Sequence, residues 1–293
     1  MQLISSLAAV VAPVMLMTLL GFVWARRGLA FDHNFVTNLV MLVGAPCLVF
    51  STLTRSLLDL SEMGRLAAAA LACLVLAAAA SAAVLKLAGL SNRVYLPSLM
   101  FPNIGNMGLP VCLFAFGEKG LAMGMIMFAV TSAVQFTIGP AIAAGRLDVA
   151  GLFKVPFVYA VLLSLGVATL GLALPQWVVN TVTLAAGCAI PLMLMSLGVA
   201  LAGLRAANLR RAVLLSALRL GLGGAVGWLV AVVLGLDGAG RGVVIIESAM
   251  PVAVFNYLFA VRYDNRPEEV AGMILVSTVM SYLSLPLLVA ALM

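Results

Sequence analysis

The sequence predicts an all-α integral membrane protein with ten transmembrane helices, arranged as two five-helix halves of inverted topology. Three observations predict this fold class: the composition is too apolar for a soluble domain, ten apolar windows have spanning length, and prolines recur at matched positions in the two halves. Helices four and nine carry proline and polar residues at mid-membrane depth, so we expect both to be broken and to cross each other.

The composition excludes several classes of protein. Of the 293 residues, 65% are apolar and only 9% are charged, whereas a soluble domain carries about 25% charged residues. A soluble enzyme, a nucleic-acid-binding domain and a disordered protein are therefore excluded. The net charge of +6 requires no nucleic-acid partner, because membrane proteins concentrate Lys and Arg in their cytoplasmic loops.

Cysteine and histidine usage argues against an enzyme or a metal centre. The four cysteines all lie in apolar runs, which is typical of buried apolar residues and not of a disulfide framework. His33 is the one histidine of the chain, so a His/Cys metal site or a Ser–His dyad inside the membrane lacks its parts. We expect no enzymatic activity and no cofactor; the only ions anticipated are H⁺ or Na⁺ as coupling ions.

Spanning the hydrocarbon core takes about 20 helical residues. The windows that fit are 3–25, 35–53, 66–88, 94–116, 121–144, 156–174, 178–201, 212–234, 243–260 and 270–292. No Lys or Arg precedes the first window, which identifies it as a span and not as a cleavable signal. Asp32, Ser61 and Ser91 are expected to be N-caps, and Pro267 is expected in a first turn. The connection at Pro175 is the least clearly marked.

The distribution of Lys and Arg predicts the orientation. With the N-terminus outside, eleven basic residues fall in cytoplasmic connections (Arg26, Arg27, Lys86, Arg93, Arg146, Lys154, Arg205, Arg210, Arg211, Arg262 and Arg266) and four in outer ones (Arg55, Arg65, Lys119 and Arg241). Because cytoplasmic loops hold the excess of basic residues, we expect a multi-pass protein of the cytoplasmic membrane with both termini outside.

The two halves of the chain resemble each other in the placement of proline. The matched pairs lie 141–146 residues apart and are Pro13 with Pro156, Pro46 with Pro191, Pro110 with Pro251, and Pro140 with Pro286. With five spans in each half, the second half enters the membrane from the opposite side, which is the pattern of alternating-access carriers. We expect repeats at 1–144 and 156–293, joined by a short cytoplasmic linker at 145–155.

Windows four and nine each contain residues that break a helix. Residues 101–110 hold two prolines, two glycines and two asparagines, and residues 247–251 run from Glu247 to Pro251, followed by Asn256. Half-helix N-termini that meet at the midplane favour an anion, while freed carbonyls can hold a cation. The alternative left open is that both segments are kinks that only improve packing.

These segments resemble the two crossover helices of the auxin efflux carrier family, through Pro102-Asn103, Gly108-x-Pro110 and Met250-Pro251. Over nearly the whole chain the sequence is most similar to the short bacterial branch, described as malonate or dicarboxylate transporters. The resemblance implies crossed fourth and ninth helices, a scaffold and a transporter domain, and a fold similar to that of bile-acid/sodium symporters. It also implies that Asn103 contacts the substrate. Asn256 stands where plant members tend to have proline, which argues against auxin as the substrate.

The candidate site residues surround the expected crossing. The substrate-binding candidates are Asn103, Asn106, Gly108, Pro110, Gln135, Arg219, Pro251 and Asn256. Glu247 is the candidate for ion coupling, as a proton acceptor or as a sodium ligand with Asn106 and Thr131, because a carboxylate inside a membrane is costly to bury. The alternatives are that Glu247 is a helix-start acid at the outer interface, that Arg219 snorkels to the cytoplasmic face, and that Thr131 and Gln135 only bond between helices.

The function that these features favour is secondary active transport of a small organic anion, malonate-like by resemblance, coupled to H⁺ or Na⁺. A passive anion channel and, with less support, a membrane-embedded enzyme remain as alternatives. The expected partners are the organic anion and membrane lipid, and no nucleic acid. Substrate identity, coupling ion, direction of transport and the existence of a homodimer are left open by the sequence.

Overall fold

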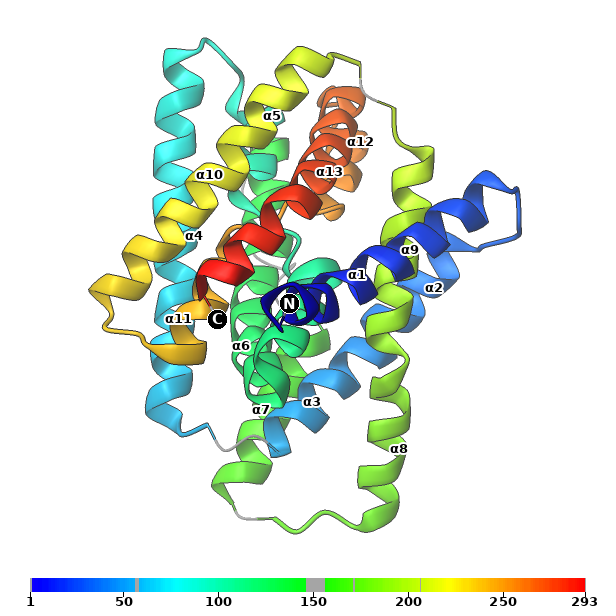
Figure 1. Ribbon diagram of the computed structural model, residues 1–293, viewed down its shortest axis with the longest axis vertical. Coiled ribbons are helices and arrows are strands. Elements are labelled where there is room, and N and C mark those ends of the chain that lie inside the picture. Colours follow the sequence, from blue (N-terminus) through cyan, green and yellow to red (C-terminus); the bar gives the residue numbers. More distant parts are fainter. Residues whose placement is uncertain (1, 56–57, 146–155, 171, 206, 293) are drawn as a thin grey trace.

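The computed structural model describes residues 2–55, 58–145, 156–170, 172–205 and 207–292, and within them every regular element is a helix. Most of the predicted linker at 145–155 lies outside the described residues. The elements are α1 (Gln2–Arg26), α2 (His33–Leu39), η1 (Val40–Gly44), α3 (Ala45–Arg55), α4 (Leu60–Leu87), α5 (Asn92–Met100), η2 (Ile104–Gly108), α6 (Leu109–Ala144), α7 (Pro156–Thr169), α8 (Gln176–Gly187), α9 (Ala189–Gly203), α10 (Leu209–Val233), α11 (Gly238–Ser248), α12 (Phe255–Arg262) and α13 (Pro267–Leu292), with η1 and η2 being π-helices. Figure 1 shows α6 near the middle of the molecule, with α4 and α10 on one side and α8 and α9 on the other.

The predicted all-α membrane class is confirmed, while the number of spans stays a prediction. Seven segments of the described chain are long and apolar enough to cross a membrane: Leu7–Arg26, His33–Arg55, Leu60–Leu87, Ile104–Ala144, Gln176–Gly203, Leu209–Val233 and Pro267–Leu292. The number is below ten because α7 has 14 residues, because α5, α11 and α12 are each shorter still, and because Ile104–Ala144 is a single segment by this measure.

That long segment doubles back on itself at Gly117. The glycine has φ 65° and ψ −158°, which is non-helical and is a conformation that glycine adopts without steric cost. A Cβ placed on Gly124 would lie 3.2 Å from Leu109 Cδ2 and 3.6 Å from Cys112 Cβ, so the two parts of α6 lie side by side. The predicted connection between windows four and five at residues 117–119 is therefore confirmed.

The helix boundaries agree with the predicted caps at all but one position. The Asp32 carboxylate accepts the Phe35 N–H at 2.9 Å, Ser91 is the N-cap of α5, and α13 begins at Pro267. The N-cap predicted at Ser61 is wrong: α4 begins at Leu60 and its cap is Asp59, which accepts the Glu62 N–H at 2.6 Å. An aspartate at this position also places a negative charge at the positive end of the helix dipole.

The helices pack in two groups. The frame group consists of α1, α2, η1, α3, α7, α8 and α9, within which α1 packs on α9 and α3 packs on α7 and α8. The crossing group consists of α4, α5, η2, α6, α10, α11, α12 and α13, within which α10 packs on α4, α11 and α13. Glycines bring backbones close in both groups: a Cβ on Gly198 would lie 1.9 Å from Thr18 O, and one on Gly223 2.1 Å from Ser248 O.

Candidate functional site

The two interrupted segments meet inside the protein. Residues 101–103 are non-helical between α5 and η2, residues 251–253 are non-helical between α11 and α12, and all six are buried. The segments run antiparallel, with Asn103 N–H donating to Pro251 O at 2.7 Å and Ala253 N–H donating to Phe101 O at 3.1 Å. The expectation that both segments are broken and that they meet is confirmed, since each is a gap between helices and not a kink.

Proline explains why the chain breaks here, and side chains from other helices explain why the breaks are tolerated. Pro102 and Pro251 have no N–H and favour an extended residue before them. Of the backbone groups that the breaks leave unpaired, Val252 N–H donates to Ser277 Oγ at 3.1 Å. The Asn256 amide donates to Pro97 O at 3.2 Å and to Phe101 O at 3.4 Å. Asn256 therefore closes the end of α5.

Arg219 binds the C-terminal ends of both broken half-helices. Its guanidinium donates to Leu99 O of α5 at 3.2 Å and to Ser248 O of α11 at 2.7 Å. The side chain is 1% exposed, so the interpretation that Arg219 snorkels to the cytoplasmic face is wrong. The carbonyl groups at a helix C-terminus carry partial negative charge, and the guanidinium donates to one such carbonyl at each of the two ends.

A small cavity adjoins the start of η2 and of α12, on the other side of the crossing. Its volume is about 20 Å³, room for about one water molecule. The predicted residues Asn103, Asn106 and Gln135 line it, together with Met41 of η1 and Met193 of α9. Gln135 Nε2 donates to Asn256 Oδ1 at 3.3 Å, while the buried Asn103 Nδ2 has no hydrogen-bond partner. We call this the amide cavity.

A second cavity, also of about 20 Å³, is lined by two further polar candidates, Thr131 and Arg219. Ser248 also lines it, and the Ser248 hydroxyl and Arg219 Nε have no hydrogen-bond partner. Pro102 and Ile104 line both cavities, so this part of the chain lies between the two cavities. The structure thus brings Asn103, Asn106 and Gln135 together and places Thr131 with Arg219.

Glu247 is the penultimate residue of α11 and is 0% exposed. The interpretation that it is a helix-start acid at the interface is wrong, because α11 begins at Gly238 and not at 243. Its Oε1 lies 3.5 Å from Cys112 Sγ, and its Oε2 has no hydrogen-bond partner. Within the described chain no ion pair reaches this carboxylate.

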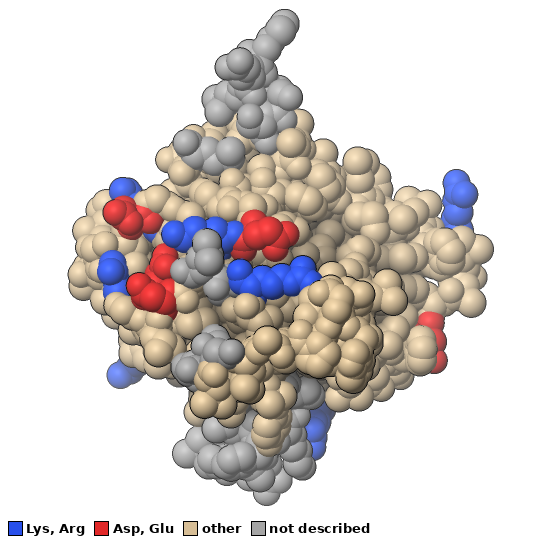
Figure 2. Space-filling model, turned by 90° about the horizontal axis from the view of Figure 1, so that it is seen from below, with Lys and Arg blue, Asp and Glu red and all other residues tan. Residues whose placement is uncertain are grey.

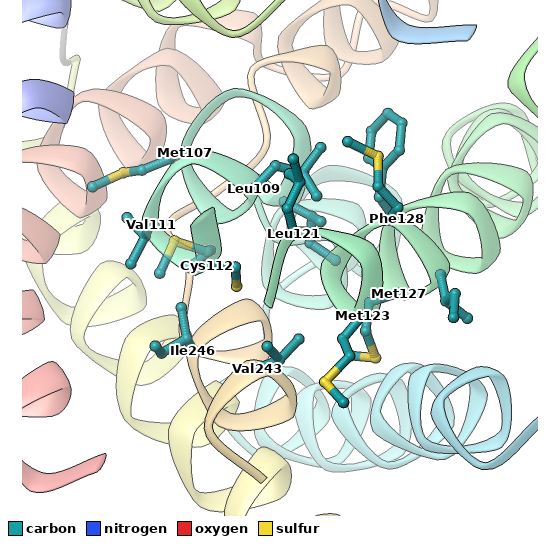
Figure 3. Close-up of a cluster of buried hydrophobic side chains, with 14 of the residues drawn as sticks. Met107, Leu109, Val111, Cys112, Leu121, Met123, Met127, Phe128, Val243 and Ile246 are labelled. Atoms are coloured by element: carbon teal, nitrogen blue, oxygen red, sulfur yellow. The ribbon is translucent and has the colours of Figure 1, made fainter. Parts of the chain in front are cut away.

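The carboxylate occupies space that two glycines leave free. A Cβ on Gly108 would lie 1.9 Å from Glu247 Oε2, and a Cβ on Gly124 would lie 2.9 Å from Oε1. Figure 3 shows the buried apolar cluster to which Cys112, the neighbour of this carboxylate, belongs, with Met107, Leu109, Val111 and Ile246. The carboxylate is thus held in an apolar core, where an ionised form without a counter-charge is costly.

The sequence interpretation missed Cys112 and Gly124 as neighbours of Glu247. The sequence contained an indication of each. Cys112 is four residues after Gly108 and so shares its helix face, and a glycine inside a helix, such as Gly124, often marks a close approach of another segment. Pro110 is the second residue of α6, where proline is well tolerated. Sharing of an ion by Glu247 with Asn106 or Thr131 stays a prediction.

The fit of Glu247 against Gly108 makes a prediction about stability. We expect Gly108→Ala to lower the free energy of unfolding by about 2 kcal/mol, a typical cost of overpacking a core. Thermal unfolding of the detergent-solubilised protein measures the change. The control is Gly64→Ala, at a helical position where an added Cβ meets nothing within 4 Å and where alanine favours the helix. Equal stability of Gly108→Ala and the unsubstituted protein would contradict the geometry.

Comparison with known proteins identifies relatives of the whole chain. A family model described as membrane transport protein matches residues 7–149 and 144–289. An uncharacterized transporter of Methanothermobacter thermautotrophicus is 26% identical over 300 residues, covering 94% of this chain and 95% of that protein. A second uncharacterized transporter, from Methanocaldococcus jannaschii, is 23% identical over 297 residues, covering 95% of this chain and 96% of that protein.

Proposed function

The chain belongs to the membrane transport protein family, and from this premise we propose that it is a secondary active transporter of a small organic anion. The transported class is a mono- or dicarboxylate, with malonate-like molecules suggested by the sequence resemblance to the bacterial branch of the auxin efflux carriers. Transport proceeds by alternating access, in which the crossing group moves relative to the frame group. A family of transporters supports a transport role and not an enzymatic one.

The observation that carries the proposal is the crossing itself. The N-terminal ends of η2 and α12 adjoin the amide cavity, and helix N-termini attract anions. The unpartnered Asn103 amide supplies a donor within the same cavity. In the structure the cavity is too small for a carboxylate substrate, which fits a closed conformation that must open for the anion to bind.

Glu247 is proposed to couple the anion to H⁺ or Na⁺. A buried carboxylate with one unpartnered oxygen is stable when it holds a proton or a cation and costly when it holds neither. In the proposed mechanism, the carboxylate takes up the proton or cation when it is accessible from one side of the membrane and releases it when it is accessible from the other. Asn106 and Thr131 are proposed as its partners if the ion is Na⁺.

We also propose that the architecture is a ten-helix inverted repeat with a fold similar to that of bile-acid/sodium symporters. The order of elements supports two halves: a single helix, an interrupted helix, a long helix, a broken helix and a final long helix occur twice. The corresponding pairs are α1 with α7, α2–η1–α3 with α8–α9, α4 with α10, α5–η2 and the start of α6 with α11–α12, and the rest of α6 with α13. The protein is proposed to lie in the cytoplasmic membrane with both termini outside; a homodimer is compatible with this arrangement.

Counterflow tests the carrier against the alternative of a channel. Vesicles preloaded with an unlabelled carboxylate should accumulate the labelled form transiently, because a carrier exchanges substrate and a pore does not. We expect Asn103→Ala to reduce the initial rate about tenfold, the effect of losing one hydrogen bond to a charged group. Asn180→Ala, on the exposed surface of α8, is the control. The absence of counterflow with every carboxylate tried would reject the carrier.

A further inference from the structure

A cavity of about 880 Å³ lies at the end of the molecule where α3 ends and α6 turns at Gly117. By the predicted orientation this is the outer end. This end is at the bottom of Figure 1, and Figure 2 views it from below, with basic and acidic side chains side by side. We call it the Arg55 cavity; its lining residues include Leu48, Ser51, Thr52, Arg55, Lys119 and Ile190.

The Arg55 cavity and the amide cavity are stacked along the same three helical segments. On η1–α3 the lining residue of the Arg55 cavity is Leu48 and that of the amide cavity is Met41, and on α6 they are Leu121 and Phe128 respectively. Seven helical residues correspond to about 10 Å. On α9, Ile190 and Met193 line the two cavities one turn apart. The Arg55 cavity therefore lies between the predicted outer surface and the amide cavity, along the same helical segments.

Small residues close the path between the two cavities. Gly44 and Ala45 lie between Met41 and Leu48 in the sequence. Gly44 is close to α9, because a Cβ on Gly44 would lie 3.3 Å from Ala189 Cβ. Small residues allow helix backbones to approach closely. One face of the Arg55 cavity belongs to the frame group and the opposite face to α6 of the crossing group, so a relative motion of the groups changes its width.

The described part of the cavity lining contains one guanidinium that is available to bind a carboxylate, that of Arg55. Arg55 donates to the neutral Thr183 hydroxyl, and among the described residues no ion pair reaches its guanidinium. Lys119 is paired with Glu62 at 3.5 Å, and Glu118 also lines the cavity. Among the described lining residues, Arg55 thus stays without a negative partner, and Glu118 stays without a positive one. Because the guanidinium is planar and presents several donors, it can bind a carboxylate through two hydrogen bonds.

The apolar part of the cavity wall is formed by Leu48, Leu113, Leu121 and Ile190, among others. We propose that the Arg55 cavity is a capture site for the transported anion, in which Arg55 binds one carboxylate and these side chains hold an apolar body. This inference rests on the proposed function and narrows its substrate class to monocarboxylates with an apolar part, because a second carboxylate would meet the apolar walls. The sequence analysis did not identify Arg55 as a candidate anion-binding residue.

Sided transport kinetics test the proposal. With hexanoate and malonate as the probes in sealed vesicles of known orientation, hexanoate should show the lower KM. Arg55→Gln should raise the KM for hexanoate about tenfold from one side of the membrane only, with Vmax changed less than twofold, as expected for loss of a charged ligand at an exposed site. The matched control is Arg65→Gln, at the same end of the molecule, whose side chain donates to Gly235 O at 3.2 Å.

Two outcomes separate this inference from the proposed function. Counterflow by the unsubstituted protein with an unchanged KM in Arg55→Gln, or an equal change from both sides, overturns the capture site and leaves the carrier intact. No counterflow with any carboxylate rejects the carrier.

Labelling of a cysteine in the cavity gives a second measurement that does not depend on transport. In a Cys47→Ser, Cys188→Ser background, Ser51→Cys should react with a membrane-impermeant thiol reagent. Hexanoate should slow this reaction at least about threefold, as expected when most sites are occupied, and Arg55→Gln should remove the protection. Protection that persists in Arg55→Gln, or a cysteine that is unreactive because lipid fills the cavity, overturns the proposal.

Discussion

Vesicles containing Glu247→Gln should show no accumulation of anion driven by a proton or sodium gradient, while exchange of anion for anion continues. Glutamine has nearly the shape of glutamate, so the packing against Gly108 and Gly124 is kept, but it cannot take up and release a cation. For one proton per anion, a gradient of one pH unit corresponds to about 1.4 kcal/mol, or about tenfold accumulation. We expect this ratio to fall to one.

The measurement is the uptake of labelled carboxylate with an imposed pH gradient or, separately, an imposed Na⁺ gradient. The arm that drives accumulation in the unsubstituted protein identifies the coupling ion. Glu268→Gln, an exposed acid at the start of α13, is the control and should retain full accumulation. Gradient-driven accumulation that survives in Glu247→Gln would exclude Glu247 as the coupling residue.

The second large effect is expected at Arg219. Arg219→Leu removes the donors to Leu99 O and Ser248 O and leaves both buried carbonyl groups without these bonds. Since a hydrogen bond to a charged group contributes about 1.5–3 kcal/mol, the loss of both should lower the free energy of unfolding by about 3 kcal/mol or more. Thermal unfolding of the protein in detergent should show a clear decrease in Tm.

Two further variants separate structural support from substrate binding at this position. Arg210→Leu changes an exposed arginine on the same helix and should leave the Tm nearly unchanged. Arg219→Lys keeps the charge but loses the planar fork that reaches two carbonyl groups, and should give an intermediate Tm. If Arg219→Leu unfolds at the temperature of Arg210→Leu but no longer binds carboxylate, the residue acts on the substrate and does not join the half-helices.

The local chemistry of proline made the breaks predictable. Pro102 and Pro251 lack an N–H wherever they stand, so an interruption near residues 100–112 and 245–257 could be inferred without knowing what lies beside them. The same applies to the turn at Gly117 and to the cap at Asp32. Ser61 was a wrong choice because Asp59 and Ser61 are both good N-caps, and only the position where the helix begins decides between them.

The polar residues show where local reasoning stops. A buried acid and a buried arginine in an apolar sequence are recognisable as exceptional, but their partners are residues of distant segments. Glu247 lies against Gly108 and Cys112, and Arg219 bonds to Leu99. No periodicity within a single helix indicates such pairs, because they depend on which helices pack together at the break.

By itself, the sequence determined the membrane class, the sites of interruption and the identity of the rare polar residues, because each follows from the chemistry of a residue and its near neighbours. The tertiary structure alone decided that residues 101–103 pair with 251–253, that Arg219 faces two helix ends, and that the Arg55 cavity and the amide cavity share the same helical segments. These features depend on side chains far apart in the sequence competing for the same buried space, and the backbone groups freed by proline took the partners that packing brought within reach.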